Sequence, residues 1–112
     1  MNNITCYAGD TPVGGMVSFH GRRMLVVDNE TIRDGLTKLG NGEVDGLCVS
    51  HVKYMFQLFD GDESFDQDIS DWDVSSVTNM SCMFHNAVAF NQDIGRWDVS
   101  SVTNMGNMFF NA

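Results

Sequence analysis

The chain has 112 residues, 43% of them hydrophobic and 11% aromatic, which suffices for one domain with a modest core and excludes a disordered chain. Its formal net charge of −9 at pH 7 argues against a nucleic-acid binder, because such proteins need a basic surface. The same charge argues against docking on anionic lipid through a polybasic patch.

The first part of the chain, residues 1–15, predicts an irregular lead-in because glycine and proline interrupt any periodicity. These residues are Gly9, Pro12, Gly14 and Gly15. The lead-in has no basic region followed by an apolar one, so it does not resemble a secretory signal. No apolar run along the chain approaches the roughly 18 residues of a membrane span. We therefore expect no transmembrane segment, and the sequence leaves the cellular compartment unknown.

Three cysteines, Cys6, Cys48 and Cys82, are separated by 42 and 34 residues, which matches no zinc-site spacing. An odd count is not a disulfide framework, so free thiols are the favoured interpretation. A single bridge between Cys6 and Cys48 is left open.

Residues 16–48 predict an N-terminal cap built from a hairpin and a helix. Apolar runs at 16–19 and 24–27 flank the stretch 20–23, in which Gly21 suits a turn. Ile32, Leu36 and Leu39 then follow at i, i+4 and i+7, which is one face of a helix. Asp28 or Asn29 suits the start of this helix, and Gly40 suits a left-handed stop at its end.

A repeat dominates the second half of the chain. FDQDISDWDVSSVTNMSCMFHNA (65–87) and FNQDIGRWDVSSVTNMGNMFFNA (90–112) are identical at 17 of 23 positions and lie 25 residues apart. A worn third copy, VSHVKYMFQLFDGDESF (49–65), aligns with 74–90 at the same offset and keeps mainly the apolar positions. Preservation of apolar character while polar residues drift is typical of positions that are kept for burial.

One 25-residue unit cannot bury its apolar side chains alone, so we expect the copies to cover one another. The predicted fold is α+β: a leucine-rich-repeat-like solenoid of about 2.5 coils over 49–112, open at its C-terminal end. Short extended segments around 92–97 and 102–105 would form narrow parallel sheets, and a helical turn would follow at 108–112. The predicted repeat ladder comprises Ile69, Trp72, Val77, Met80 and Phe84, with Ile94, Trp97 and Val102 at equivalent positions of the last copy.

The repeat F-N-Q-D-I-x-x-W-D-V-S-S-V-T-N-M-x-x-M-F-x-N-A resembles that of BspA-like leucine-rich-repeat surface proteins, a family long labelled a domain of unknown function in mycoplasmas. The resemblance covers residues 44–112, and the stretch before them looks like the lead-in to a first repeat. It implies a solenoid displayed at a cell surface that binds proteins or other cells. It implies no catalytic residues and no cofactor.

The acidic stretch 60–73 invites a calcium interpretation. An EF-hand loop that began at Asp60 would need glycine at its sixth position and glutamate at its twelfth, where this chain has Phe65 and Asp71. The sequence therefore favours repeat structure over calcium binding, without deciding the question. The methionines of the repeat fit core packing better than a metal site, and no serine or cysteine occupies a nucleophile motif. We thus expect a protein that is not an enzyme and holds no metal.

Two classes of function remain. The first is a protein–protein interaction scaffold, possibly of the surface or adhesion type. The alternative is a structural or accessory subunit whose partners cover the end of the repeats in a larger assembly. Both use the last copy, which lacks a polar cap. We expect a protein partner or self-association through Met105, Met108, Phe109 and Phe110.

Overall fold

In the computed structural model, which describes residues 5–112, the first two strands form the predicted hairpin. Strand β1 (Met16–Phe19) pairs antiparallel with β2 (Arg22–Val26). The loop consists of His20 and Gly21 alone, with φ angles of 52° and 77°. Positive φ at both positions is the geometry of a two-residue hairpin turn. The turn is thus shorter than the predicted stretch 20–23, because the two arginines belong to β2.

Helix α1 (Ile32–Gly40) carries the chain from β2 to β3 (Gly46–Cys48), which lies parallel to β2 and completes a sheet of order β1-β2-β3. A parallel neighbour needs such a crossover connection. The predicted apolar face of the helix contacts the main core: Ile32 is buried, whereas Leu36 and Leu39 are only half-buried.

The start of α1 differs from the expectation. Thr31 is the residue that precedes the helix, rather than Asp28 or Asn29. The Asp28 carboxylate instead accepts the Thr31 N–H at 2.9 Å, which closes a turn before the helix. The Asn29 side chain accepts the N–H groups of Lys53 and Tyr54 at 2.7 and 3.1 Å, so it joins the helix entry to a distant part of the chain.

The end of α1 is also shifted. Gly40 remains helical, Asn41 follows it, and the left-handed residue is Gly42, with φ of 76°. The Gly42 N–H donates to the Leu39 carbonyl at 3.1 Å and closes the last turn. Glycine tolerates positive φ at either position, so the sequence alone did not decide between them.

Residues 5–15 of the predicted irregular lead-in hold no regular strand, although Cys6 forms a single parallel bridge with Trp72. The rest of that prediction, residues 1–4, lies outside the described residues.

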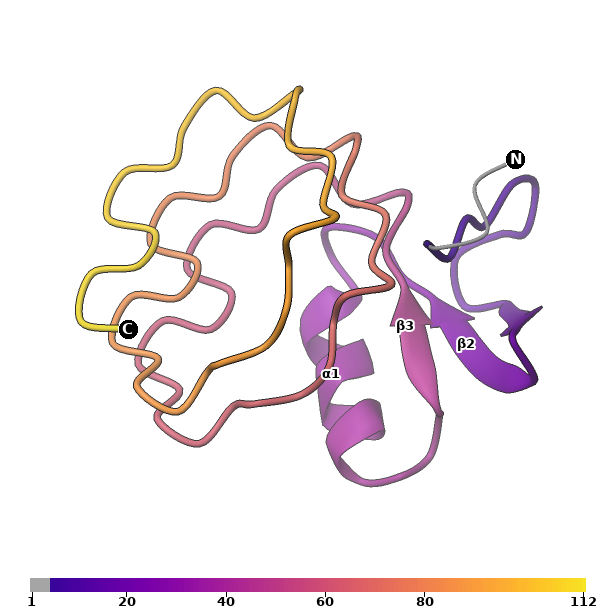
Figure 1. Ribbon diagram of the computed structural model, residues 1–112. Helices are drawn as coiled ribbons and strands as arrows, with labels where there is room; N and C mark the ends of the chain where they lie inside the picture. The colour runs from indigo at the N-terminus through magenta and orange to yellow at the C-terminus, as the bar shows by residue number, and fades with distance from the viewer. Residues whose placement is uncertain (1–4) are drawn as a thin grey trace.

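The second half of the chain consists of turns, and we divide it into segment 1 (49–64), segment 2 (65–89) and segment 3 (90–112). Figure 1 shows the three segments as neighbouring loops on one side of α1 and β3, with segment 3 farthest out. Parallel bridges join Tyr54 to Asn79 and Asn79 to Asn104, so residues 25 apart lie opposite each other.

The predicted leucine-rich-repeat-like solenoid is wrong. The described residues form a small mixed α+β domain with three strands and one helix, all of which lie before residue 49. The narrow parallel sheets expected from 92–97 and 102–105 are absent from this part of the structure, where single bridges replace them. Turns rather than a helix occupy 108–112.

The physical reason is the density of side-chain turns in these segments. The Asp73 carboxylate accepts both the N–H and the hydroxyl of Ser75, at 3.1 and 2.6 Å. Asp98 and Ser100 repeat this turn at 3.0 and 2.6 Å. Such turns satisfy the backbone locally and bend it every few residues, which leaves no stretch long enough for a strand ladder.

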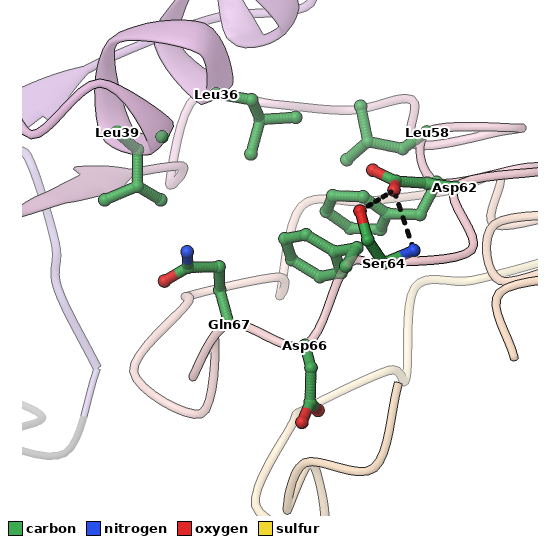
Figure 2. A pocket seen from close by; sticks show the side chains of 10 residues that line it. Leu36, Leu39, Leu58, Asp62, Ser64, Asp66 and Gln67 are labelled. Carbon is green, nitrogen blue, oxygen red and sulfur yellow. Dashed lines mark hydrogen bonds between the residues drawn. The ribbon is translucent and has the colours of Figure 1, made fainter. Parts of the chain in front are cut away.

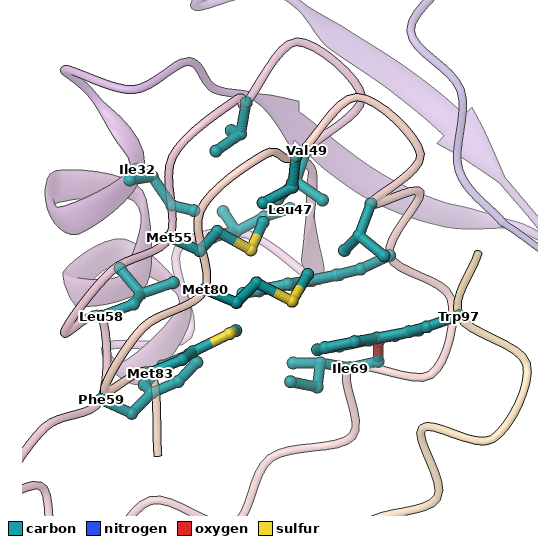
Figure 3. Packing of buried hydrophobic residues seen from close by; sticks show 14 of the residues in the cluster. Ile32, Leu47, Val49, Met55, Leu58, Phe59, Ile69, Met80, Met83 and Trp97 are labelled. Carbon is teal, nitrogen blue, oxygen red and sulfur yellow. The ribbon is translucent and has the colours of Figure 1, made fainter. Parts of the chain in front are cut away.

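One apolar core joins the two halves of the chain, as Figure 3 shows in close-up. Ile32 of α1 and Leu47 of β3 belong to the same cluster as Met80 and Trp97. The Trp97 indole N–H donates to the Ile69 carbonyl at 3.1 Å, so its polar atom is satisfied inside the core. Because residues of 16–48 and 49–112 share this cluster, segment 1 is covered on its inner side by α1 and β3.

Candidate functional site

Most backbone hydrogen bonds between the segments run in one direction. The exceptions are the N–H groups of Thr78 and Thr103, which donate back to the Lys53 and Thr78 carbonyls, both at 2.8 Å. The Met55 N–H of segment 1 donates to the Asn79 carbonyl of segment 2, and the Met80 N–H of segment 2 donates to the Asn104 carbonyl of segment 3, both at 2.8 Å. Three further alternate positions repeat this pattern in each segment. They are Gln57 to Ser81, Phe59 to Met83 and Gly61 to His85, then Cys82 to Gly106, Phe84 to Met108 and Asn86 to Phe110. Each segment therefore directs a row of N–H groups toward the next one.

In segment 3 the equivalent donors are the N–H groups of Met105, Asn107, Phe109 and Asn111. Within residues 5–112, none of these four donates to a protein group. They form the outer row of the domain, and a row of unpaired backbone groups is a ready template for pairing with another chain.

The aromatic columns end at the same place. The Phe84 ring stacks on Phe59 at a centroid distance of 5.5 Å and on Phe109 at 5.6 Å. Phe84 is fully buried between them, whereas Phe109 is 53% exposed. Phe110 stacks on His85 at 5.3 Å and is 55% exposed. The outer faces of both rings are therefore left without the neighbour that Phe84 has.

We call Met105, Asn107, Phe109, Phe110 and Asn111 together the end surface. Of the four interface residues predicted from the sequence, Met105, Phe109 and Phe110 are exposed on it. Met108 is not, because only 5% of it is accessible and its side chain belongs to the main core.

The side chains of the predicted ladder also become less buried toward the end surface. Its segment 2 members, Ile69, Trp72, Val77, Met80 and Phe84, are all buried. In segment 3 Trp97 is buried, but Ile94 and Val102 are only half-buried.

One feature of the three segments was not predicted from the sequence, namely their left-handed residues. Gly61, Asn86 and Asn111 occupy equivalent positions and have φ angles of 74°, 59° and 58°. Glycine and asparagine are the residues that adopt this conformation most readily. The occurrence of glycine in one copy and asparagine in the other two, at one aligned position, was the signal in the sequence for this conformation.

A second candidate is the cavity between α1 and the turn that joins segments 1 and 2, shown in Figure 2. Its volume is about 260 Å³, below the roughly 300–1,000 Å³ typical of ligand pockets. The Ser64 hydroxyl donates to the Asp62 carboxylate at 3.3 Å, and the described residues that line the cavity include no histidine that could relay a proton from it. The cavity therefore offers no nucleophile and base arranged for catalysis.

Charged groups of the domain take part in its turns and in an ion pair between β2 and segment 2. Hydrogen bonds from Ser70 and Ser100 hold the pKa of Asp68 and of Asp98 below their ordinary value. Burial raises the pKa of Asp71, although Arg22 forms an ion pair with it at 2.9 Å. Across residues 5–112, no three His, Cys, Asp or Glu side chains meet in an arrangement that would hold a metal ion.

Among the described residues, no helix is long and apolar enough to cross a membrane. A family model described as "Mycoplasma protein of unknown function, DUF285" matches residues 29–112. Searches of curated proteins and of solved structures found no match.

Proposed function

The chain belongs to the DUF285 family of Mycoplasma proteins of unknown function, and from this premise we propose that it is a non-catalytic module that binds a protein partner through its end surface. The observation that carries the proposal is the contrast between equivalent positions. The Phe84 N–H and ring both have partners in segment 3, whereas those of Phe109 have none on the outer side. A partner would supply to Phe109 what segment 3 supplies to Phe84.

Burial of the rings gives such binding its driving force. Covering a large apolar side chain completely is worth roughly 1.5–3 kcal/mol. Phe109 and Phe110 are about half exposed, so each contributes part of that amount. The unpaired N–H groups add direction and register rather than much energy, because water satisfies them in the free protein.

The donor row also limits the chemistry of the partner. Two copies of the chain that met through their end surfaces would bring mainly N–H groups against N–H groups, which cannot pair. A suitable partner presents carbonyl oxygens at alternate residues of a segment that bends as segment 3 does, together with apolar side chains for Phe109 and Phe110. As in strand addition, main-chain hydrogen bonds would extend an exposed edge, but here the edge is made of turns.

Charge does not oppose such a partner. Segment 3 contains Asp93, Arg96 and Asp98, a net charge of −1 (1 − 2), whereas the whole chain carries −9. None of the five residues of the end surface is charged, so a neutral or weakly acidic protein can approach it.

A closer relationship to the BspA-like surface proteins is part of this proposal, and it rests on the repeated motif of segments 2 and 3. It would place the module at a cell surface, where binding to proteins or other cells is the expected role. The alternative is a structural subunit whose end surface is permanently covered, and a partner that co-purifies at fixed stoichiometry would favour it.

The test uses peptides selected from a random-peptide display library on the full chain. The variant carries Phe109→Asp and Phe110→Asp. Its matched control carries Tyr54→Asp and Phe56→Asp, which replace two aromatic residues that are 53% and 48% exposed in segment 1. We expect the end-surface variant to bind the selected peptides on the order of 30-fold more weakly than the parent chain does. This is the effect of removing a strong interface residue. Equal weakening by both variants, or by neither, would refute the proposal.

A further inference from the structure

Two cysteines that are 42 residues apart in the chain lie side by side in the structure. Cys6 of the lead-in and Cys48 at the end of β3 are 1% and 0% exposed, and both belong to a second, smaller apolar cluster. Each thiol is the main influence on the pKa of the other, which is raised for Cys6 and lowered for Cys48. Cys82, in segment 2, is not a member of this cluster.

Backbone hydrogen bonds hold both residues in place. The Cys6 N–H donates to the Asp71 carbonyl at 2.7 Å, and the Cys48 carbonyl accepts the Val27 N–H at 3.1 Å. Two residues beyond each cysteine, the Ala8 N–H donates to the Ser50 hydroxyl at 3.0 Å. This last bond joins the two stretches directly on one side of the sulfur atoms and holds the lead-in beside the end of β3.

We propose that Cys6 and Cys48 form a redox-sensitive pair, which a small-molecule disulfide such as oxidised glutathione converts into an intramolecular disulfide that fastens the lead-in to β3. This site is separate from the end surface and does not depend on the function proposed for it.

The reaction proceeds by two exchanges. The Cys48 thiolate attacks one sulfur of the small disulfide, which leaves a mixed disulfide and one small thiolate. The Cys6 sulfur then attacks Cys48 and releases the second small thiolate. The protein thiols lose two electrons and two protons in total, and the small disulfide gains them as two thiols. Cys48 is the first nucleophile because it stays in β3, whereas Cys6 moves away with the lead-in when the sulfur atoms become accessible.

Burial controls when this chemistry occurs. Both sulfur atoms are shielded while the lead-in is docked, so the oxidant reacts with molecules in which residues 5–8 have transiently opened. Docking then brings Cys6 back onto the mixed disulfide. The cross-link closes a long loop, and a link of this kind restricts the unfolded chain most strongly.

The test is oxidation of the full chain by oxidised glutathione, followed by alkylation of the remaining thiols in denaturant and measurement of the intact mass. We expect one alkylated cysteine in place of three, and a peptide map that joins Cys6 to Cys48. The melting temperature should rise on the order of 10 °C and return to its starting value with a reductant. Cys82→Ser should behave like the parent chain, whereas Cys6→Ser and Cys48→Ser should gain neither the link nor the stability.

Three alkylated cysteines after prolonged oxidation would overturn the proposal. So would a link that involves Cys82, or only glutathione adducts and intermolecular dimers. The same oxidation in urea provides the reference, because an unfolded chain mixes all three pairings, whereas the folded chain should give one.

Discussion

Replacing Gly35 with alanine tests the packing of α1 against the sheet. An exposed glycine inside a helix usually costs about 0.5–1 kcal/mol relative to alanine, so the substitution would stabilise an isolated helix. Gly35, however, is buried. A Cβ atom at this position would lie 2.8 Å from Val27 Cγ1 and 3.1 Å from Leu47 Cδ2. Carbon atoms pack best at about 3.5–4.0 Å, so both contacts are too close.

Neither neighbour can move away easily, since Val27 is 1% exposed and Leu47 is fully buried. Overpacking of this kind costs about 1–3 kcal/mol, which exceeds the gain in helix propensity. We therefore expect Gly35→Ala to lower the free energy of unfolding by roughly 1–2 kcal/mol. Urea unfolding followed by far-UV circular dichroism and tryptophan fluorescence measures this quantity.

The matched control is Gly40→Ala, in the last turn of the same helix. Nothing lies within 4 Å of the Cβ position there. The variant should be unchanged or up to about 1 kcal/mol more stable. If Gly35→Ala were as stable as Gly40→Ala, the close approach of α1 to Val27 and Leu47 would be wrong.

Two further predictions concern the segments. Phe84→Ala should lower the free energy of unfolding by about 3–5 kcal/mol because the ring is fully buried, whereas Phe109→Ala at the equivalent position should lower it by about 1 kcal/mol or less; similar losses would contradict the gradient of burial toward the end surface. The hydrogen bonds from Ser100 lower the pKa of Asp98 below 3.8, so its carboxylate stabilises the fold above the unfolded pKa, and this contribution is lost as the pH falls through the folded value. Thermal unfolding between about pH 6 and about pH 3 should therefore show a smaller acid-induced loss of stability for Ser100→Ala than for the parent chain or for Ser101→Ala, and equal losses would refute the role of the turn.

The sequence predicts the local elements of the fold well because each has a pattern of its own. Two apolar runs around a glycine located the hairpin, apolar residues at helical spacing located α1, and the repeat located the 25-residue register. The prediction of extended segments was wrong because aspartate and serine side chains close turns, as Asp73 and Ser75 do. A hydrophobic pattern does not show that such turns compete with extended backbone. The end surface was predicted from apolar residues alone, so the exposure of Phe109 was anticipated, but the burial of Met108 and the row of N–H donors were not.

The contact between Cys6 and Cys48 shows a second limit. It depends on the lead-in docking beside Trp72 and Ser50, contacts that span more than 40 residues of chain. No local pattern in a single sequence encodes such a contact, so the sequence could leave the bridge open but not decide it.

The stacking of each segment on the preceding one also bears on how the chain folds during synthesis. A ribosome releases about 5–20 residues per second, so 25 residues need roughly 1–5 s. Closing a short loop takes well under a millisecond. Each segment therefore has time to settle on the preceding one before its successor emerges, and α1 and β3 are the first to be available. At any time a nascent chain exposes the unpaired N–H groups of only its last folded segment, on the side toward its growing end. A chaperone that shields this edge therefore needs to recognise only one arrangement of backbone groups.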